Sequence, residues 1–321
     1  MGVIKTYPVH SVQFWRCYAI HMRPYLLFIS GIAGLSGMAM SPNFTESGWK
    51  SIVAFIPFFT GYGFGQALTD CFQTDTDKLS APYRPLSKGI VAVRDVLLVS
   101  IVGLLASGIL FYLLNPVCFY LSLALVFGLA TYSYIKKNFW FGGPFYNAWI
   151  VALLPIMGYF SLTNLSLKEF PLYNVSFFFL SFFSYASFVL IGYLKDIEAD
   201  KTTNYKTFPV VFGWKKTVIA GDFIAFVTLT LFWLSINYNW LTIIIGIIGS
   251  IVIIFGQMLG HLSKKETEKE ALVPIIATVR SFIILHIAII LHFHSYLWIF
   301  ALLYYGLFEW TLFKRPAKYQ V

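Results

Sequence analysis

Long apolar stretches, broken by short polar segments, run through nearly the whole chain. About ten of them are long enough to cross a bilayer as a helix, which takes roughly 20 residues. They lie at about 24–41, 50–69, 92–114, 116–135, 145–163, 174–194, 216–236, 239–260, 271–291 and 294–313. The pattern predicts an all-α, polytopic membrane bundle of nine to ten transmembrane helices, with nine if 294–313 is not a full span.

The segment before the first span is different in character. Residues 1–22 combine the basic residues Lys5 and Arg16 with the aromatic residues Phe14, Trp15 and Tyr18. This segment is too long and too polar for the start of a cleavable signal peptide. Basic and aromatic residues in an amphipathic segment are typical of the membrane surface. We therefore expect a retained interfacial segment that leads into the first span.

Composition agrees with a membrane protein. Hydrophobic residues make up 58% of the 321 residues and charged residues 12%, and the mean hydropathy of +0.74 excludes an ordinary soluble domain. Aromatic residues make up 19%. Most of these rings are expected to pack between helices, although a cavity lined by aromatic rings is allowed. The cysteines Cys17, Cys71 and Cys118 lack the spacing of metal ligands and are expected to be free thiols.

The positive charges, which give a formal net charge of +9, alternate between loops. Lys and Arg gather in 70–91, 136–144, 195–215, 261–270 and the C-terminal tail. The opposite loops, 42–49, 164–173, 237–238 and 292–293, carry only Lys168, with Lys50 at an edge. Loops rich in Lys and Arg face the cytoplasm, so both chain ends are predicted to be cytoplasmic. No nucleic-acid-binding motif accompanies the charge, and the sequence sets no oligomeric state.

A first acidic cluster ends the second apolar stretch. Asp70, Gln73 and Asp77 are spaced i, i+3 and i+7, with Gln66 one turn earlier, and on a continuous helix they would share one face, whereas Asp75 would not. Each carboxylate costs roughly 2.5–3.5 kcal/mol to insert at membrane depth. A cation is therefore expected on this face, and Mg²⁺ prefers carboxylate and phosphate oxygens. The alternative is a solvated helix end with acids paired to lysines.

A second acidic cluster ends the sixth stretch on the same side of the membrane. Asp196 and Asp200, spaced i and i+4, share a helix face with Tyr193. Two acidic helix ends on one side of the membrane can converge on shared metal ions. Two solvated ends placed there by chance are the alternative.

In these two clusters the sequence resembles the UbiA family of intramembrane prenyltransferases. The family's first motif, Asn-Asp-x-x-Asp-x-x-x-Asp with a Tyr-Arg-Pro loop, is matched by Thr69, Asp70, Gln73 and Asp77 and by Tyr83, Arg84 and Pro85. The second motif, Lys/Arg-Asp-x-x-x-Asp with Thr-x-Pro and Gly downstream, is matched by Lys195, Asp196, Asp200, Thr207, Pro209 and Gly213. A weaker third match is Tyr132, Ser133, Lys136, Lys137 and Asn147, and Arg23 with Pro24 before the first span is also similar to the family. The resemblance covers roughly residues 22 to 290.

This resemblance implies one domain over 1–321, built as a helical bundle around a lateral cavity, with the span 294–313 additional to the core. It implies Mg²⁺ ions that bind the diphosphate of an isoprenyl donor between the two motifs. The metal-binding and catalytic residues would be Asp70, Asp77, Asp196 and Asp200, with Gln73 as a further metal ligand. The diphosphate or substrate contacts would be Arg84, Lys195, Lys137, Tyr193 and Asn147, although the basic residues could instead be topology charges.

Three departures from the family pattern bear on the site. Thr69 replaces the usual Asn and Gln73 replaces an acid, which removes one negative charge from the first motif. Asn204 and Tyr205 stand where many members have Gly. Two charged residues also lie within apolar stretches. Arg280 is expected either to bind an acidic ligand or to pair with a carboxylate, and Asp222 is expected to be a structural partner.

The leading functional hypothesis is a Mg²⁺-dependent membrane prenyltransferase. It would move an isoprenyl group from a diphosphate donor to a lipid-soluble or aromatic acceptor and release pyrophosphate. A membrane terpene cyclase of the same fold is the near rival. A cation-coupled transporter would place acids near the bilayer midplane in inverted repeats, which are not evident here. The changes at Thr69 and Gln73 also leave an inactive family member as an alternative.

Overall fold

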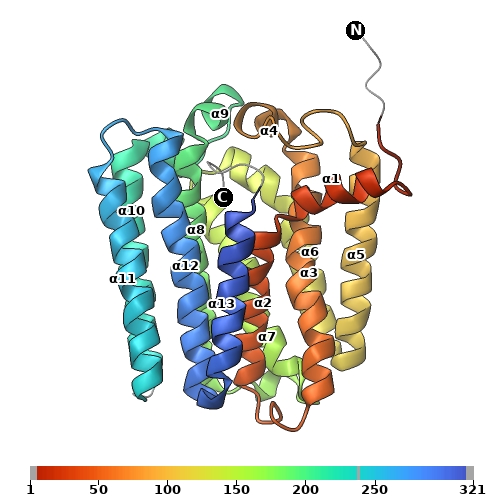
Figure 1. The fold of residues 1–321 in the computed structure, drawn as a ribbon, viewed down its shortest axis with the longest axis vertical. Coiled ribbons are helices and arrows are strands. Elements are labelled where there is room, and N and C mark those ends of the chain that lie inside the picture. Colours follow the sequence, from red (N-terminus) through yellow and green to blue (C-terminus); the bar gives the residue numbers. More distant parts are fainter. Residues whose placement is uncertain (1–5, 237–238, 316–321) are drawn as a thin grey trace.

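The computed structural model describes residues 6–236 and 239–315, and in these ranges every regular element is a helix (Figure 1). Each predicted apolar stretch contains one helix that runs along the bundle. These helices are α2 (Leu27–Ala39), α3 (Gly48–Phe72), α5 (Val93–Leu114), α6 (Pro116–Asn138), α7 (Asn147–Ser161), α8 (Val175–Gly192), α10 (Phe208–Ser235), α11 (Trp240–Leu262), α12 (Glu268–Phe293) and α13 (Trp298–Phe313).

Within the described ranges, eight helices are long and apolar enough to cross a membrane. The other two, α2 and α7, are shorter. Single turns extend several helices: η1 (Pro24–Leu26), η2 (Gly142–Tyr146), η3 (Leu167–Glu169), η4 (Leu172–Asn174), η5 (Tyr193–Lys195) and η6 (Ser295–Leu297). The all-α membrane bundle predicted from the sequence is confirmed.

The centre of the bundle is formed by α2, α7, α8 and α12. In α12, 83% of the most apolar 18-residue stretch is buried. Two glycines allow α2 and α7 to approach closely. A Cβ atom on Gly37 would collide with the Pro155 carbonyl oxygen, and one on Gly158 would collide with the Gly34 carbonyl oxygen. Small residues at such crossings let membrane helices pack backbone to backbone.

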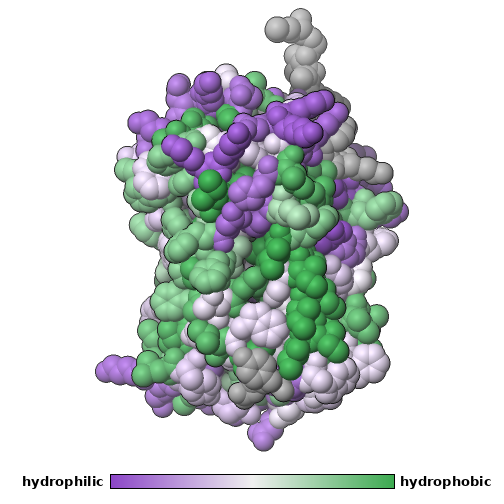
Figure 2. Space-filling view, turned by 90° about the vertical axis from the view of Figure 1, so that its left-hand side faces the viewer, coloured by the Kyte–Doolittle hydropathy of each residue, from purple (hydrophilic) through white to green (hydrophobic). Residues whose placement is uncertain are grey.

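The outer helices present apolar side chains to the surroundings. Only 28% of the most apolar 18-residue stretch of α5 is buried inside the protein, and only 22% of the corresponding stretch of α6. Figure 2 shows the hydrophobic residues over the middle of the molecule and hydrophilic residues gathered at one end. This distribution is the one expected for a protein that sits across a bilayer.

Three short helices lie at the hydrophilic end of the bundle: α1 (Val12–Met22), α4 (Thr74–Ser80) and α9 (Ile197–Thr202). Helices α4 and α9, which carry the last acid of each motif, contact each other, and the Thr76 and Thr203 hydroxyls lie 3.1 Å apart. Figure 1 shows α1 lying across the bundle, as expected of an interfacial segment. Residues 1–5 of that expected segment, and the expected loop 237–238, lie outside the described residues.

The intramembrane charge Arg280 of α12 is paired with a carboxylate. Its Nε and Nη2 atoms donate to Oε1 and Oε2 of Glu309 on α13, both at 2.7 Å, and the Tyr305 hydroxyl donates to the same carboxylate. Of the two roles expected for Arg280, pairing is the one that the structure shows. Asp222 pairs with His261 of α11 at 2.6 Å, which is the structural role expected for it.

Candidate active site

The first acidic motif does not lie on one continuous helix. Helix α3 ends at Phe72, Gln73 has non-helical torsion angles (φ −119°, ψ 23°), and α4 begins at Thr74. The expectation that Asp70, Gln73 and Asp77 share one helix face is therefore wrong. The physical reason lies in the segment after Gln73, where Thr74 and the acid Asp75 favour a new helix N-terminus. The turn nevertheless brings Asp70 and Asp77 to the same arginine.

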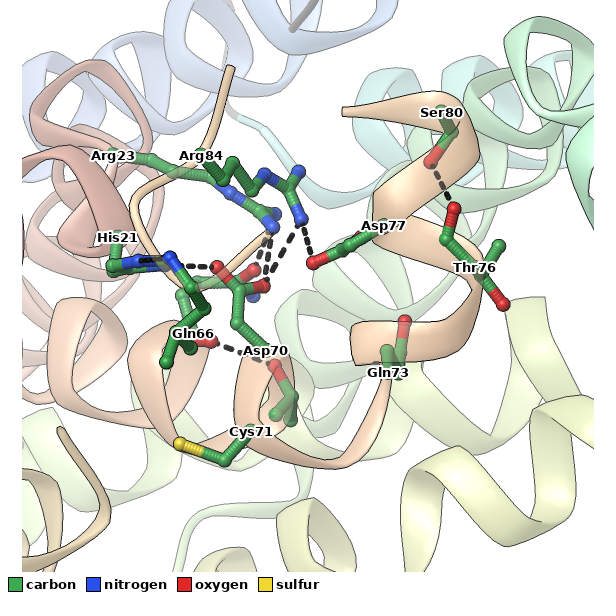
Figure 3. A network of polar contacts seen from close by, with 12 residues as sticks. His21, Arg23, Gln66, Asp70, Cys71, Gln73, Thr76, Asp77, Ser80 and Arg84 are labelled. Carbon is green, nitrogen blue, oxygen red and sulfur yellow. Dashed lines mark hydrogen bonds and ion pairs between the residues drawn. The ribbon is translucent and has the colours of Figure 1, made fainter. Parts of the chain in front are cut away.

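Asp70 is buried, with 3% of its surface exposed, and three protein groups contact its carboxylate (Figure 3). Nδ1 of His21 lies 2.8 Å from Oδ2. Nη2 of Arg23 donates to Oδ1 at 2.7 Å, and Nη1 of Arg84 donates to the same oxygen at 3.3 Å. Arg23 also donates to the Gln66 side-chain oxygen at 2.6 Å. A buried carboxylate needs such partners, because an unpaired one would be strongly destabilising.

Arg84 joins the two acids of this motif. Its Nη1 atom also donates to Oδ2 of Asp77, at 2.5 Å. The loop that carries Arg84 is held at Leu86, whose backbone N–H donates to Nε2 of His21 at 3.3 Å. Burial lowers the pKa of Arg84, but the carboxylates of Asp70 and Asp77 more than offset this and keep its pKa well above the ordinary value. Arg84 therefore stays charged inside the protein.

The second motif is split between two environments. Asp196 precedes α9 and lines the cleft between the two motifs. Asp200 is fully buried outside the lining of that cleft, where Oδ1 lies 3.4 Å from Nζ of Lys136 and Oδ2 accepts a hydrogen bond from Thr207 at 3.1 Å. Burial raises the pKa of Asp200, and the charge of Lys136 opposes that shift.

The end of α6 places neighbouring lysines in different surroundings. Lys136 is buried and lines the cleft, and its ammonium group lies 5.0 Å from the ring centroids of Tyr193 and Tyr205. Lys137 is partly exposed, pairs with Asp75 at 3.4 Å, and lies 5.0 Å from the same Tyr205 ring centroid without lining the cleft. Lys137, expected to contact the diphosphate, therefore lies outside the cleft, and Lys136 occupies the expected place. A helix turns by about 100° per residue, so consecutive residues cannot share one face.

The residues around this cleft enclose about 890 Å³, part of it open to solvent. Most of the predicted site residues line it: Asp70, Gln73, Asp77, Arg84, Asn147, Tyr193, Lys195 and Asp196. Lys137 and Asp200 do not. The further lining residues include Arg23, Tyr132 and Lys136, which belong to the family resemblance but were given no role at the site. They also include Tyr62 and Tyr185, which the sequence analysis did not single out, and it did not single out His21 behind Asp70.

A second, apolar cavity adjoins the polar cleft and holds about 670 Å³ of empty space, part of it open. The two share five lining residues: Tyr62, Gln66, Leu129, Asn147 and Tyr185. The hydroxyl groups of Tyr62 and Tyr185 lie 2.9 Å apart, and we call these five residues the neck. Phe58 and Phe111 line the cavity farther along α3 and α5, with ring centroids 4.8 Å apart. Gln66 and Phe58 are eight residues apart on α3, which is about 12 Å along the helix axis.

The oxygen atoms at the cleft suit a hard cation such as Mg²⁺. Among residues 6–236 and 239–315, no three His, Cys, Asp or Glu side chains form a closed metal cage. Carboxylates from both motifs, Asp77 and Asp196, and the side chain of Gln73 nevertheless line the same cleft. Mg²⁺ usually takes only one or two carboxylates and completes its shell with substrate phosphate and water. The residues present therefore fit a Mg²⁺ ion that arrives with a diphosphate.

Fold and cleft together define a membrane-embedded helical protein with a polar, charged site at one end and an apolar cavity behind it. The chain belongs to the UbiA prenyltransferase family, whose model matches residues 28–283. The membrane prenyltransferase predicted from the two motifs is thus confirmed at the level of the family. His21 and Arg23 precede the matched region.

Curated relatives include two archaeal enzymes, each named digeranylgeranylglyceryl phosphate synthase. The chain is 25% identical to the Pyrococcus horikoshii enzyme, over 65% of this chain and 73% of the relative. It is 26% identical to the Thermococcus kodakarensis enzyme, over 67% of this chain and 76% of the relative.

Solved structures confirm the fold. The apo structure of a UbiA homolog from Aeropyrum pernix K1 matches with a TM-score of 0.69 and 18% identity, over 83% of this chain and 96% of the homolog. A UbiA homolog from Archaeoglobus fulgidus bound to GPP and Mg²⁺ matches with a TM-score of 0.62 and 18% identity, over 85% of this chain and 99% of the homolog.

Proposed function

We propose that this protein transfers an isoprenyl group from an isoprenyl diphosphate, bound together with Mg²⁺, to a lipid-soluble acceptor and releases pyrophosphate. The observation that supports this most strongly is that the two spaces adjoin. A cleft with four cationic side chains and both acidic motifs shares the neck with an apolar cavity. A ligand with a diphosphate head and a hydrocarbon tail has this same division of polarity.

The diphosphate would lie in the polar cleft. Arg23, Arg84, Lys136 and Lys195 line it and can donate charge-assisted hydrogen bonds to phosphate oxygens. Mg²⁺ would be held by Asp196 and the side-chain oxygen of Gln73, while Asp77 stays paired with Arg84, and when bound it would help to neutralise charge on the departing diphosphate. Asp200, which faces Lys136, would act by holding that lysine in place.

The isoprenyl tail would extend through the neck into the apolar cavity, so that the reacting carbon lies near Tyr62 and Tyr185. When the C1–O bond breaks, its electron pair stays on the diphosphate oxygen and an allylic cation remains. Aromatic ring faces stabilise such a cation, and an apolar enclosure keeps water away from it. Tyr132 and Tyr193, whose hydroxyls lie 2.6 Å apart, would border the same region on the polar side.

The acceptor and the orientation are part of the proposal. The Pyrococcus and Thermococcus relatives are named for making digeranylgeranylglyceryl phosphate, so a glyceryl phosphate lipid is the first acceptor to test, with aromatic acceptors second. The end that carries α4 and α9 would face the cytoplasm, because the loops rich in Lys and Arg lie there. The whole of 1–321 would work as one domain.

The test is release of pyrophosphate by the purified protein in nanodiscs with Mg²⁺ and geranyl, farnesyl or geranylgeranyl diphosphate, with and without an acceptor. We expect release that requires Mg²⁺ and falls at least about a hundredfold in Asp196→Asn, as typical of lost transition-state charge stabilisation. Asp75→Asn is the matched control, because Asp75 pairs with Lys137 outside the cleft. A cyclised product formed without acceptor would instead indicate a terpene cyclase. The proposal would be contradicted if no donor were ionised and no donor bound.

A further inference from the structure

The carboxylate of Asp70 is already occupied by the protein's own donors. A carboxylate offers about four lone-pair positions, and His21, Arg23 and Arg84 take three of them. All three contacts are well below the surface, since Asp70 is 3% exposed and His21 is fully buried. A metal ion could reach this carboxylate only by displacing at least one of these partners.

His21 also fixes the arrangement of the contacts around Asp70. Because the Leu86 N–H donates to Nε2, the proton of a neutral His21 must be on Nδ1, which therefore donates to Asp70. His21 thus connects Asp70 to the loop that carries Arg84. His21 therefore fixes the position of the Asp70 carboxylate and of the loop that carries Arg84.

The charge balance of the first motif disfavours a divalent ion there. Asp70 and Asp77 carry two negative charges, and Arg23 and Arg84 carry two positive charges against them. Thr69 and Gln73, which replace the family's usual residues, add no negative charge to this motif. The Thr69 hydroxyl donates to the Gln66 carbonyl oxygen, and the Gln73 amide donates to Ser133. A divalent cation placed next to Asp70 would add two positive charges beside buried guanidinium groups, which is unfavourable in a low-dielectric site.

We propose that Asp70, set by His21, is a positioning residue that holds Arg23 and Arg84 as the phosphate-binding cations of the first motif. In this arrangement, two guanidinium groups stand in for a second metal ion, and the enzyme binds a single divalent ion at Asp196. This inference rests on the proposed function, because it concerns how the diphosphate is held. The arginines would bind phosphate oxygens through N–H donors, so no proton needs to move when the C1–O bond breaks.

The experiment compares Asp70→Asn with Asp196→Asn, two identical changes at one cleft. Full-length protein in nanodiscs is titrated with Mn²⁺ in the presence of inorganic diphosphate, and bound Mn²⁺ is counted by electron paramagnetic resonance. We expect one Mn²⁺ per chain for the wild type and for Asp70→Asn, and loss of that ion in Asp196→Asn. Calorimetry should show inorganic diphosphate binding that is about tenfold or more weaker in Asp70→Asn.

Two further variants keep the inference testable if Asp70→Asn does not fold. Arg23→Gln and Arg84→Lys should each weaken inorganic diphosphate binding by about tenfold, while the number of Mn²⁺ ions bound at saturating diphosphate stays at one per chain. Two bound Mn²⁺ in the wild type, loss of Mn²⁺ in Asp70→Asn, or unchanged diphosphate binding in both arginine variants would overturn the inference.

These outcomes differ from a failure of the proposed function. If the wild type releases pyrophosphate from donors but Asp70→Asn loses Mn²⁺, only the arginine arrangement is wrong. If the wild type binds neither Mn²⁺ nor diphosphate and releases nothing, the proposed function fails and the arrangement fails with it.

Discussion

Lys136 and Lys137 show how much depends on single positions at the cleft. Both are basic residues at the end of α6, but one is buried against Asp200 and two tyrosine rings while the other is partly exposed beside Asp75. The sequence predicts that a basic residue from this segment serves the site. The sequence analysis chose Lys137, whereas the structure places Lys136 in the cleft, because the rotation of α6 is set by packing against α5, α7 and η2.

We expect Lys136→Gln to lower kcat/KM about tenfold to a hundredfold, because a hydrogen bond to a charged group contributes about 1.5–3 kcal/mol. Lys137→Gln should change it less than about twofold, since an exposed pair contributes little. Steady-state pyrophosphate release measures both variants, with thermal unfolding to exclude misfolding. Equal losses in the two variants would contradict the assignment of Lys136.

The first motif marks the limit of residue-level prediction. Spacing and the family resemblance located Asp70, Gln73 and Asp77 at one site, and they line one cleft. The assumption of a continuous helix was wrong because α3 breaks at Gln73. The two groups that complete the surroundings of Asp70, His21 and Arg23, lie more than 40 residues away in sequence. Periodicity within one segment cannot reveal a partner supplied by another.

At the scale of elements, the closeness of α2 and α7 depends on glycine. We expect Gly37→Ala to lower the midpoint of thermal unfolding by about 5 °C or more, because its methyl group would meet the Pro155 carbonyl. Gly306→Ala on α13 is the control, as nothing lies within 4 Å of a Cβ atom there, and alanine favours the helix. Equal effects of the two substitutions would show that the contact is not tight in the folded protein.

The apolar cavity makes a prediction about donor length. Phe58, which packs against Phe111, lies about 6 Å from Tyr62 and about 12 Å from Gln66 along the axis of α3. An isoprene unit, with four chain bonds of about 1.5 Å, spans about 5 Å. Phe111→Ala should therefore raise kcat/KM for a donor one unit longer than the preferred one, relative to that preferred donor.

The control for this change is Phe127→Ala, which removes an equally large ring from the exposed face of α6. Product masses from competing donors measure the preference. An unchanged preference in Phe111→Ala, or the same shift in both variants, would show that the two rings do not limit the length of the chain.

For the whole molecule, the alternation of apolar stretches and basic loops was enough to predict the bundle and to place both motifs at one end. The sequence could not predict which of the apolar helices lie inside the bundle and which lie on its outside. Both α12 and α13 are apolar, yet 83% of the most apolar 18-residue stretch is buried in α12 and 22% in α13. Which helix lies inside depends on contacts between distant segments, and apolar runs that face lipid resemble those that face protein.

The pair between Arg280 and Glu309 fastens α13 to α12 and gives the prediction at this scale. We expect Glu309→Gln to lower stability by about 3 kcal/mol or more, because a half-buried arginine would lose its only carboxylate among the contacts described. Asp222→Asn, which breaks an exposed pair between α10 and α11, should have little effect. Denaturant titration in detergent measures the free energy of unfolding of both variants. Similar losses would argue that the membrane pair has no special importance.

The position of His21 has a consequence for where the working unit of the protein begins. The family match starts at residue 28, and a boundary drawn there would leave out α1 together with His21 and Arg23. Such a boundary keeps the shared bundle but cuts away two of the three groups that surround Asp70. If His21 and Arg23 act as proposed, the functional unit extends beyond the region that the family model matches, and a shortened form that folds well should still bind diphosphate poorly.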